Sequence, residues 1–130
     1  MYSSTFIFAT KQFDAEFHRL DHVIAAAAKA TPGYLGEETW ENAGTGQVSN
    51  VYYWDSLEAL QLLMQHPAHL EAKAAQAKWL AGYQVIISQV LRSYGDGTLA
   101  HPAASAARCA KVAPCSPPSP PPTGSRCTGW

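Results

Sequence analysis

The chain has 130 residues, 47% of them hydrophobic and 11% aromatic, which suffices for the core of one domain but not of two. Its net charge of −1 gives no reason to expect nucleic acid or an anionic membrane as a partner. No apolar run approaches the roughly 18 residues of a membrane span, and the opening "MYSSTFIFATK" lacks the pattern of a signal peptide. We therefore expect a soluble, cytoplasmic protein.

The first part of the chain predicts a strand, a helix and a hairpin. Ser4–Thr10 is short and rich in β-forming residues, as in a strand. Apolar side chains then recur at steps of four and three, as on one helical face: Phe13, Phe17, Leu20, Ile24 and Ala27. "TPGYLG" ends that helix, and "YLGEETWEN", "AGTG" and "QVSNVYYW" predict two strands joined by a glycine-containing loop.

A second helical region follows the hairpin. Asp55 is the predicted N-cap, and Glu58 would complete a capping box. One face of the helix would then hold Leu57, Leu60 and Met64. Pro67 interrupts the pattern, which resumes at Leu70, Ala74 and Ala77, so we expect two pieces that meet near His66.

The last predicted strand, Tyr83–Tyr94, is followed by a change in composition. Residues 95–130 show no hydrophobic period, and they contain a Pro-Pro-Ser-Pro-Pro-Pro run that favours polyproline II geometry. We predict a folded domain over 1–94 and a disordered Pro/Ala/Ser-rich tail over 95–130; the alternative is a proline-rich ligand for a partner domain.

The three cysteines, Cys109, Cys115 and Cys127, match no zinc pattern and are interpreted as incidental thiols.

The order β-α-β-β-α-β is that of a ferredoxin-like α+β fold, in which helices cover one face of a four-stranded antiparallel sheet. Several strands are nevertheless apolar on both sides: in the third, Val51 and Tyr53 point one way and Tyr52 and Trp54 the other. The face without helices would expose more apolar area than a monomer usually tolerates. We therefore expect a homodimer in which two sheets pack face to face.

Four segments, "PGYLGEETWEN", "VYYWDSLEAL", "HPAHLEAK" and "KWLAGYQVIISQVLRSY", resemble the antibiotic biosynthesis monooxygenase domain, a family of dimeric α+β barrels. The resemblance spans about residues 4–94. It implies cofactor-independent oxidation of a small aromatic, phenol- or quinol-like compound in a pocket between sheet and helices, with no metal or other cofactor. The alternatives are a non-catalytic dimeric module that binds a small apolar molecule, and an isomerase or lyase of the same superfold.

Such chemistry needs an apolar slot, a group that holds the substrate's oxygen, and a base. Phe8, Tyr52 and Trp54 could line the slot, Asn50 could hold the oxygen, and His66 or His69 is the expected base, since imidazole titrates near neutrality. Structural roles compete with each of these. Trp54 could pack in the core, Asn50 could satisfy backbone groups, and His66 could flank the helix break before Pro67.

Two other patterns argue against metal or haem chemistry. His18 and His22 have the spacing of a metal clamp but fall opposite the apolar stripe of their helix, so we expect them to be solvated. The haem-degrading relatives use an asparagine on the first strand and a tryptophan on the second helical region. Here the first strand has no asparagine, and Leu62, Leu63 and Met64 stand where the tryptophan would be.

Overall fold

The computed structural model describes residues 1–104, apart from the side chain of Thr10. Along the chain it contains β1 (Tyr2–Thr10), α1 (Ala15–Ala30), β2 (Tyr34–Glu41), β3 (Gln47–Trp54), α2 (Leu57–Met64), α3 (Pro67–Ala75), a short 3₁₀ turn η1 (Gln76–Lys78) and β4 (Leu80–Gln89). The predicted order is confirmed, with the second helical region divided at Pro67. The part of the predicted tail beyond residue 104, with the three cysteines, lies outside the described residues.

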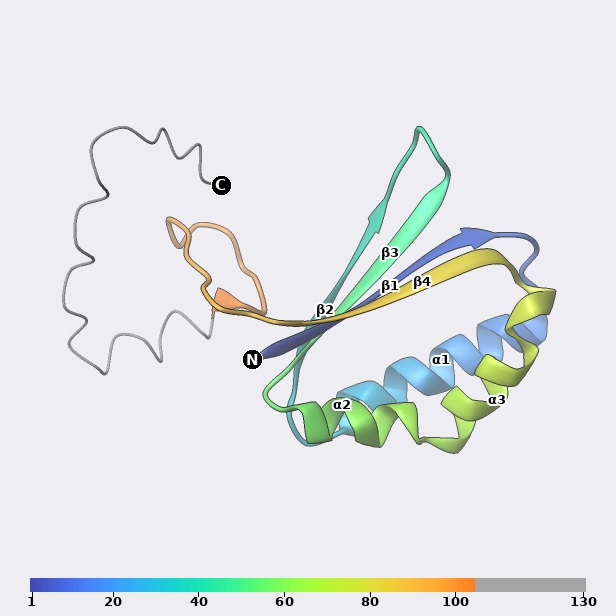
Figure 1. Cartoon of the computed structure of the whole chain (residues 1–130), viewed down its shortest axis with the longest axis horizontal. Helices are drawn as coiled ribbons and strands as arrows, with labels where there is room; N and C mark the ends of the chain where they lie inside the picture. Colours follow the sequence, from blue (N-terminus) through green and yellow to red (C-terminus); the bar gives the residue numbers. More distant parts are fainter. Residues whose placement is uncertain (105–130) are drawn as a thin grey trace.

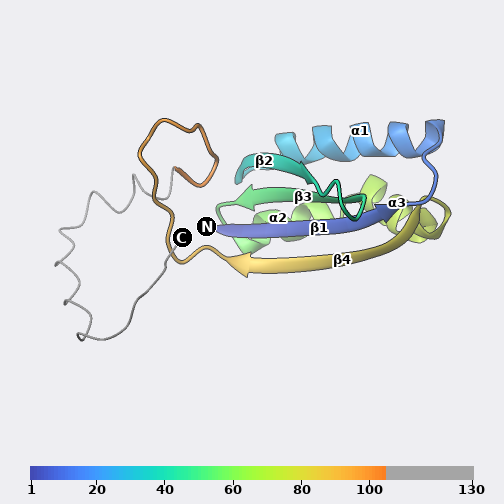
Figure 2. The same ribbon diagram turned by 90° about the horizontal axis from the view of Figure 1, so that it is seen from above.

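The four strands form one antiparallel sheet in the order β2-β3-β1-β4, so β1 pairs with both β3 and β4. All three α-helices lie on the same side of this sheet (Figure 1). The view from above shows β4 at the edge of the sheet farthest from α1 (Figure 2). This is the predicted ferredoxin-like α+β arrangement. No helix within the described residues has the length and apolar character needed to cross a membrane.

The N-cap of α2 differs from the prediction by one residue. The Ser56 hydroxyl oxygen accepts a hydrogen bond from the Ala59 backbone N–H at 3.2 Å, so Ser56 rather than Asp55 caps the helix. The backbone N–H of Asp55 donates to the Gly33 carbonyl at 2.8 Å, which keeps Asp55 in the connection from β3. Glu58 is consequently at the second helical position, one residue short of the capping-box position.

The buried face of α2 also differs from the prediction. Its buried residues are Ala59, Leu60 and Leu63, whereas Leu57 and Met64 are 38% and 36% exposed. On α3 the side chains that pack on the core are the small ones, Ala68, Ala72 and Ala75, and the predicted Leu70 is 53% exposed. Alanine lets α3 lie close to α1, so its small side chains face the core while the larger leucine points outward.

The last strand begins and ends earlier than predicted, at Leu80 and Gln89 instead of Tyr83 and Tyr94. Trp79 precedes it and is only 3% exposed. The Trp79 indole N–H donates to the Asp14 carboxylate at 3.0 Å, and its carbonyl accepts the Lys11 N–H at 2.8 Å. These bonds anchor the start of β4 beside the end of β1, where the first residues of the strand are already paired.

The face of the sheet opposite the helices, here called the outer face, carries apolar and polar side chains in alternating rows. The register places Ile7 beside Ser49 and Gln84, and Thr5 beside Val51 and Ile86. Trp40 of β2 also pairs with Ser49 and is 63% exposed. The outer face therefore exposes apolar side chains that a packing partner would bury, although its serines and glutamines make it less apolar than predicted.

Candidate functional site

A cavity of about 410 Å³ lies between the sheet and the helices. Its volume falls in the range of small-molecule sites. The lining is mainly apolar, and polar groups from β1, β3, β4, α1, α3 and η1 interrupt it: Ser4, Thr5, Asn50, Tyr52, Tyr83, Asp21, His69, Lys73 and Gln76. The cavity exists because β4 has no helix packed over its inner face. Tyr83, Val85 and Ile87 of β4 line it while remaining 45–48% exposed.

Aromatic rings form the sheet side of the cavity. Phe6 and Phe8 stand on β1 with ring centroids 5.2 Å apart, and Phe6 lies 5.8 Å from Tyr83. Phe17 enters from α1. Phe8 is only 7% exposed because it also belongs to the core. The predicted slot residue therefore both lines the cavity and packs in the core. Flat apolar walls of this kind favour a planar ring as ligand.

Asn50 lines the cavity next to Phe6, its partner in the β1–β3 register. Its side-chain oxygen accepts a hydrogen bond from the Thr39 hydroxyl at 3.0 Å. That bond orients the amide and leaves the –NH₂ group without a partner among the described residues. Asn50 can therefore donate a hydrogen bond to an oxygen of a ligand.

Tyr52 lies two residues further along the same face of β3. Burial of the phenol raises its pKa strongly, and the adjacent Glu37 carboxylate raises it further. The hydroxyl thus keeps its proton at any ordinary pH. Tyr52 can line the cavity and hydrogen bond as a neutral phenol, but it cannot act as a phenolate base.

His69 brings an imidazole to the cavity from α3. Burial lowers its pKa below the usual 6.5, and the positive charge of Lys73, one turn later on the same helix, lowers it further. Nδ1 of the ring is buried and has no hydrogen-bond partner among the described residues. His69 is therefore a neutral imidazole near pH 7, and one of its ring nitrogens has unused hydrogen-bonding capacity.

Two charged residues that the sequence patterns did not single out also line the cavity. Lys73 stands one helical turn after His69 on α3. Asp21 lines the cavity from α1, where partial burial raises the pKa of its carboxyl against the opposing effect of His18. The i, i+4 spacing of His69 and Lys73 was the available signal. Nothing local indicated Asp21.

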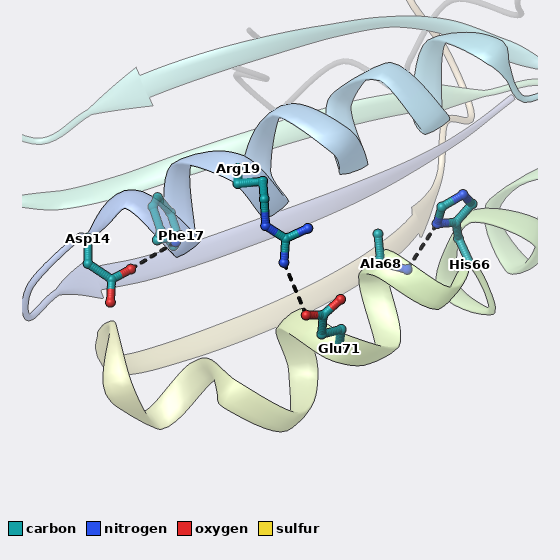
Figure 3. A network of polar contacts seen from close by, with 6 residues as sticks. All are labelled: Asp14, Phe17, Arg19, His66, Ala68 and Glu71. Atoms are coloured by element: carbon teal, nitrogen blue, oxygen red, sulfur yellow. Dashed lines mark hydrogen bonds and ion pairs between the residues drawn. The ribbon is translucent and has the colours of Figure 1, made fainter.

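Two predicted site residues do not reach the cavity. Trp54 is fully buried between the helices and the sheet, and its indole N–H donates to the Ser4 hydroxyl at 3.1 Å. His66 caps α3: its Nδ1 accepts the Ala68 N–H at 3.1 Å, as Figure 3 shows beside the Arg19–Glu71 ion pair that joins α1 to α3. Both side chains thus take the structural role considered as the alternative.

The described residues contain no group of three or more histidine, cysteine, aspartate or glutamate side chains placed to hold a metal ion. His18 and His22 are exposed on α1, as expected from their helical phase. On α2, Leu63 and Met64 contribute aliphatic surface to the cavity, and Leu62 points to solvent.

Comparison with known proteins identifies this architecture. No family model matches the chain. Uncharacterized protein YqjZ of Bacillus subtilis is 28% identical over 92 residues, 70% of this chain and 80% of its own. The structure of Rv0793 from Mycobacterium tuberculosis matches with a TM-score of 0.61 at 17% identity, covering 72% of this chain and 98% of its own.

Two further structures carry names that bear on chemistry. SnoaB of Streptomyces nogalater, a cofactor-independent oxygenase, has a TM-score of 0.60 at 14% identity, over 73% of this chain and 97% of its own. A Caulobacter crescentus protein named as a proposed antibiotic biosynthesis monooxygenase has a TM-score of 0.58 at 20% identity, over 70% of this chain and 90% of its own. The fold of this chain is thus that of the antibiotic biosynthesis monooxygenases, as the sequence resemblance implied.

Proposed function

We propose that the protein is a cofactor-independent monooxygenase that oxidises a small, phenol- or quinol-like aromatic compound. One observation carries the proposal: the same apolar cavity holds a neutral imidazole, an amide with free donors and aromatic walls, from His69, Asn50 and Phe8. The fold shared with a named cofactor-independent oxygenase supports it.

In this mechanism His69 takes a proton from the bound aromatic compound, and Asn50 donates a hydrogen bond to the oxygen on which the negative charge develops. The electron-rich anion then reacts with dioxygen. A ring CH₂ loses both hydrogens, one oxygen atom becomes the new carbonyl oxygen, and the other leaves as water. This is a four-electron oxidation in which the substrate supplies all four electrons that reduce dioxygen, so no external reductant is consumed.

Oxygen uptake with hydroxynaphthalenes and anthrones tests this function. We expect uptake by the unaltered protein and a loss of about a hundredfold or more in kcat for His69→Ala, as is usual for removal of a general base. His22→Ala is the matched control, because His22 is an exposed histidine outside the cavity. His66→Ala should keep its turnover, since His66 only caps α3.

The other outcomes separate the alternatives. A rise in melting temperature with these compounds, without oxygen uptake, would indicate a binding module instead of an oxygenase. Conversion of a compound without oxygen consumption would indicate an isomerase or lyase. Full turnover by His69→Ala would remove His69 from the mechanism.

We also propose that the functional unit is a homodimer formed by the outer faces of two sheets. Trp40 and Ile86 are exposed there, and Ile7 and Val51 lie between them in the register. Burial of these side chains against a second sheet would remove their apolar surface from water. The cavity lies on the opposite side of the sheet and stays open in such a dimer.

A further inference from the structure

The last residues that the structure describes return to the outer face of the sheet. After β4, the chain passes the start of β1, where the Val90 N–H donates to the Met1 carbonyl at 3.0 Å. Residues 95–104 then lie at that end of the sheet, on the side away from the helices (Figure 1). Ala103 is only 6% exposed, so this segment is packed and does not merely pass by.

Glu38 of β2 holds the segment through both of its carboxylate oxygens. Nε2 of His101 lies 2.8 Å from Oε2, and the Tyr53 hydroxyl donates to Oε1 at 2.8 Å. The His101 ring also meets the Tyr53 ring edge to face, with centroids 5.2 Å apart. The carboxylate and imidazole side chains are 20% and 29% exposed, so their bond is partly shielded from water. Such a bond is worth more than an ion pair on the open surface.

A hydrogen bond within the segment orients the His101 ring for this contact. Nδ1 of His101 accepts the Ala103 backbone N–H at 3.0 Å, which places the proton of the neutral ring on Nε2, directed at Glu38. The same three residues, His-Pro-Ala, form the same bond at the start of α3, where His66 accepts the Ala68 N–H. A local turn that orients the imidazole lowers the entropy cost of docking.

Gly36 of β2 provides the space for Pro102. Its φ is +154°, and a Cβ at this position would lie 2.5 Å from Cγ of Pro102. A side chain at residue 36 would therefore displace the proline. Gly36, Glu38 and Tyr53 together form a notch on the outer face that fits the His101–Ala103 segment by shape and by hydrogen bonding. We call these three residues the docking notch.

We propose that the His101–Ala103 segment is an intramolecular cover that competes with a second copy of the chain for the outer face. This inference rests on the proposed dimer. Sheets that pack face to face stand about 10 Å apart, and interdigitated side chains fill that gap. A main-chain segment seated in the docking notch cannot share it, so the segment must leave before two outer faces meet.

Sedimentation velocity over a concentration series tests the competition on the full chain. His101→Ala removes the bond to Glu38 but leaves the outer face itself unchanged. We expect the dimer dissociation constant to fall about tenfold or more, because a partly buried charge-assisted bond no longer opposes association in either protomer. His22→Ala, on α1, is the control and should match the unaltered chain.

Hydrogen–deuterium exchange supplies a second readout of docking. Peptides that cover residues 97–104 should exchange faster in both His101→Ala and Glu38→Ala, the second of which leaves the segment's own residues unchanged. Unaltered exchange in Glu38→Ala would show that the notch does not hold the segment, and would overturn the inference.

The sedimentation outcomes distinguish this inference from the dimer proposal. Equal dissociation constants for His101→Ala and the unaltered chain would remove the competition and leave the dimer. A weaker dimer for His101→Ala would also overturn it, because the segment would then be part of the interface. Monomers at every concentration in both proteins would overturn the dimer and the competition together.

Discussion

His69 and Lys73 lie one helical turn apart on α3, and both side chains line the cavity. The lysine charge disfavours a second positive charge on the imidazole, and burial acts in the same direction. A base must be unprotonated to act, so turnover is lost as the pH falls through the pKa of His69. Because the pKa of His69 lies below 6.5, turnover should be lost on the acidic side of neutrality.

Removal of the lysine charge should move this acidic limb toward higher pH. In Lys73→Ala we expect a higher pKa for His69 and therefore a smaller fraction of turnover retained near pH 6. Titration of the His69 ring protons by NMR measures the pKa directly, whether or not a substrate is found. Lys78→Ala, in η1, is the matched control, and an equal shift in both variants would contradict a specific effect of Lys73.

At the scale of elements, the one-residue difference at the start of α2 has an energetic consequence. Ser56→Ala removes the side-chain oxygen that accepts the Ala59 N–H, so the free energy of unfolding should fall by about 1 kcal/mol. Asp55→Ala should cost less, because the Asp55 carboxylate is not the cap. Urea denaturation measures the free energy of unfolding of both variants. A larger loss for Asp55→Ala would show that Asp55 is the cap, as the sequence predicted.

The elements themselves were predictable from the sequence because their signals are local. A stripe at steps of three and four, such as Phe13, Phe17 and Leu20, needs no information from elsewhere in the chain. The faces of α2 and α3 were less predictable. Which face each helix buries depends on the elements packed against it, as for Leu60 of α2 and Ala68 of α3.

At the scale of the whole molecule, the outer face should decide the oligomeric state. Ile86→Lys places a charge at an exposed outer-face position, which a second sheet would have to bury without a partner, so the dimer should weaken by a hundredfold or so. Leu62→Lys, at an exposed position on α2, is the control and should leave association unchanged. Light scattering at several concentrations measures the molar mass of both variants. Equal masses for the two variants would place the interface elsewhere.

The sequence alone determined the order of strands and helices and the break at Pro67, because periodicity acts over short stretches. The family resemblance supplied the candidate site residues. The tertiary structure decided which candidates meet. Pairing of β1 with β3 sets Asn50 beside Phe6, and the same register sends Trp54 into the core. It also brought His101 to Glu38, 63 residues away in sequence. Contacts at that separation depend on the folded sheet, and no local pattern encodes them.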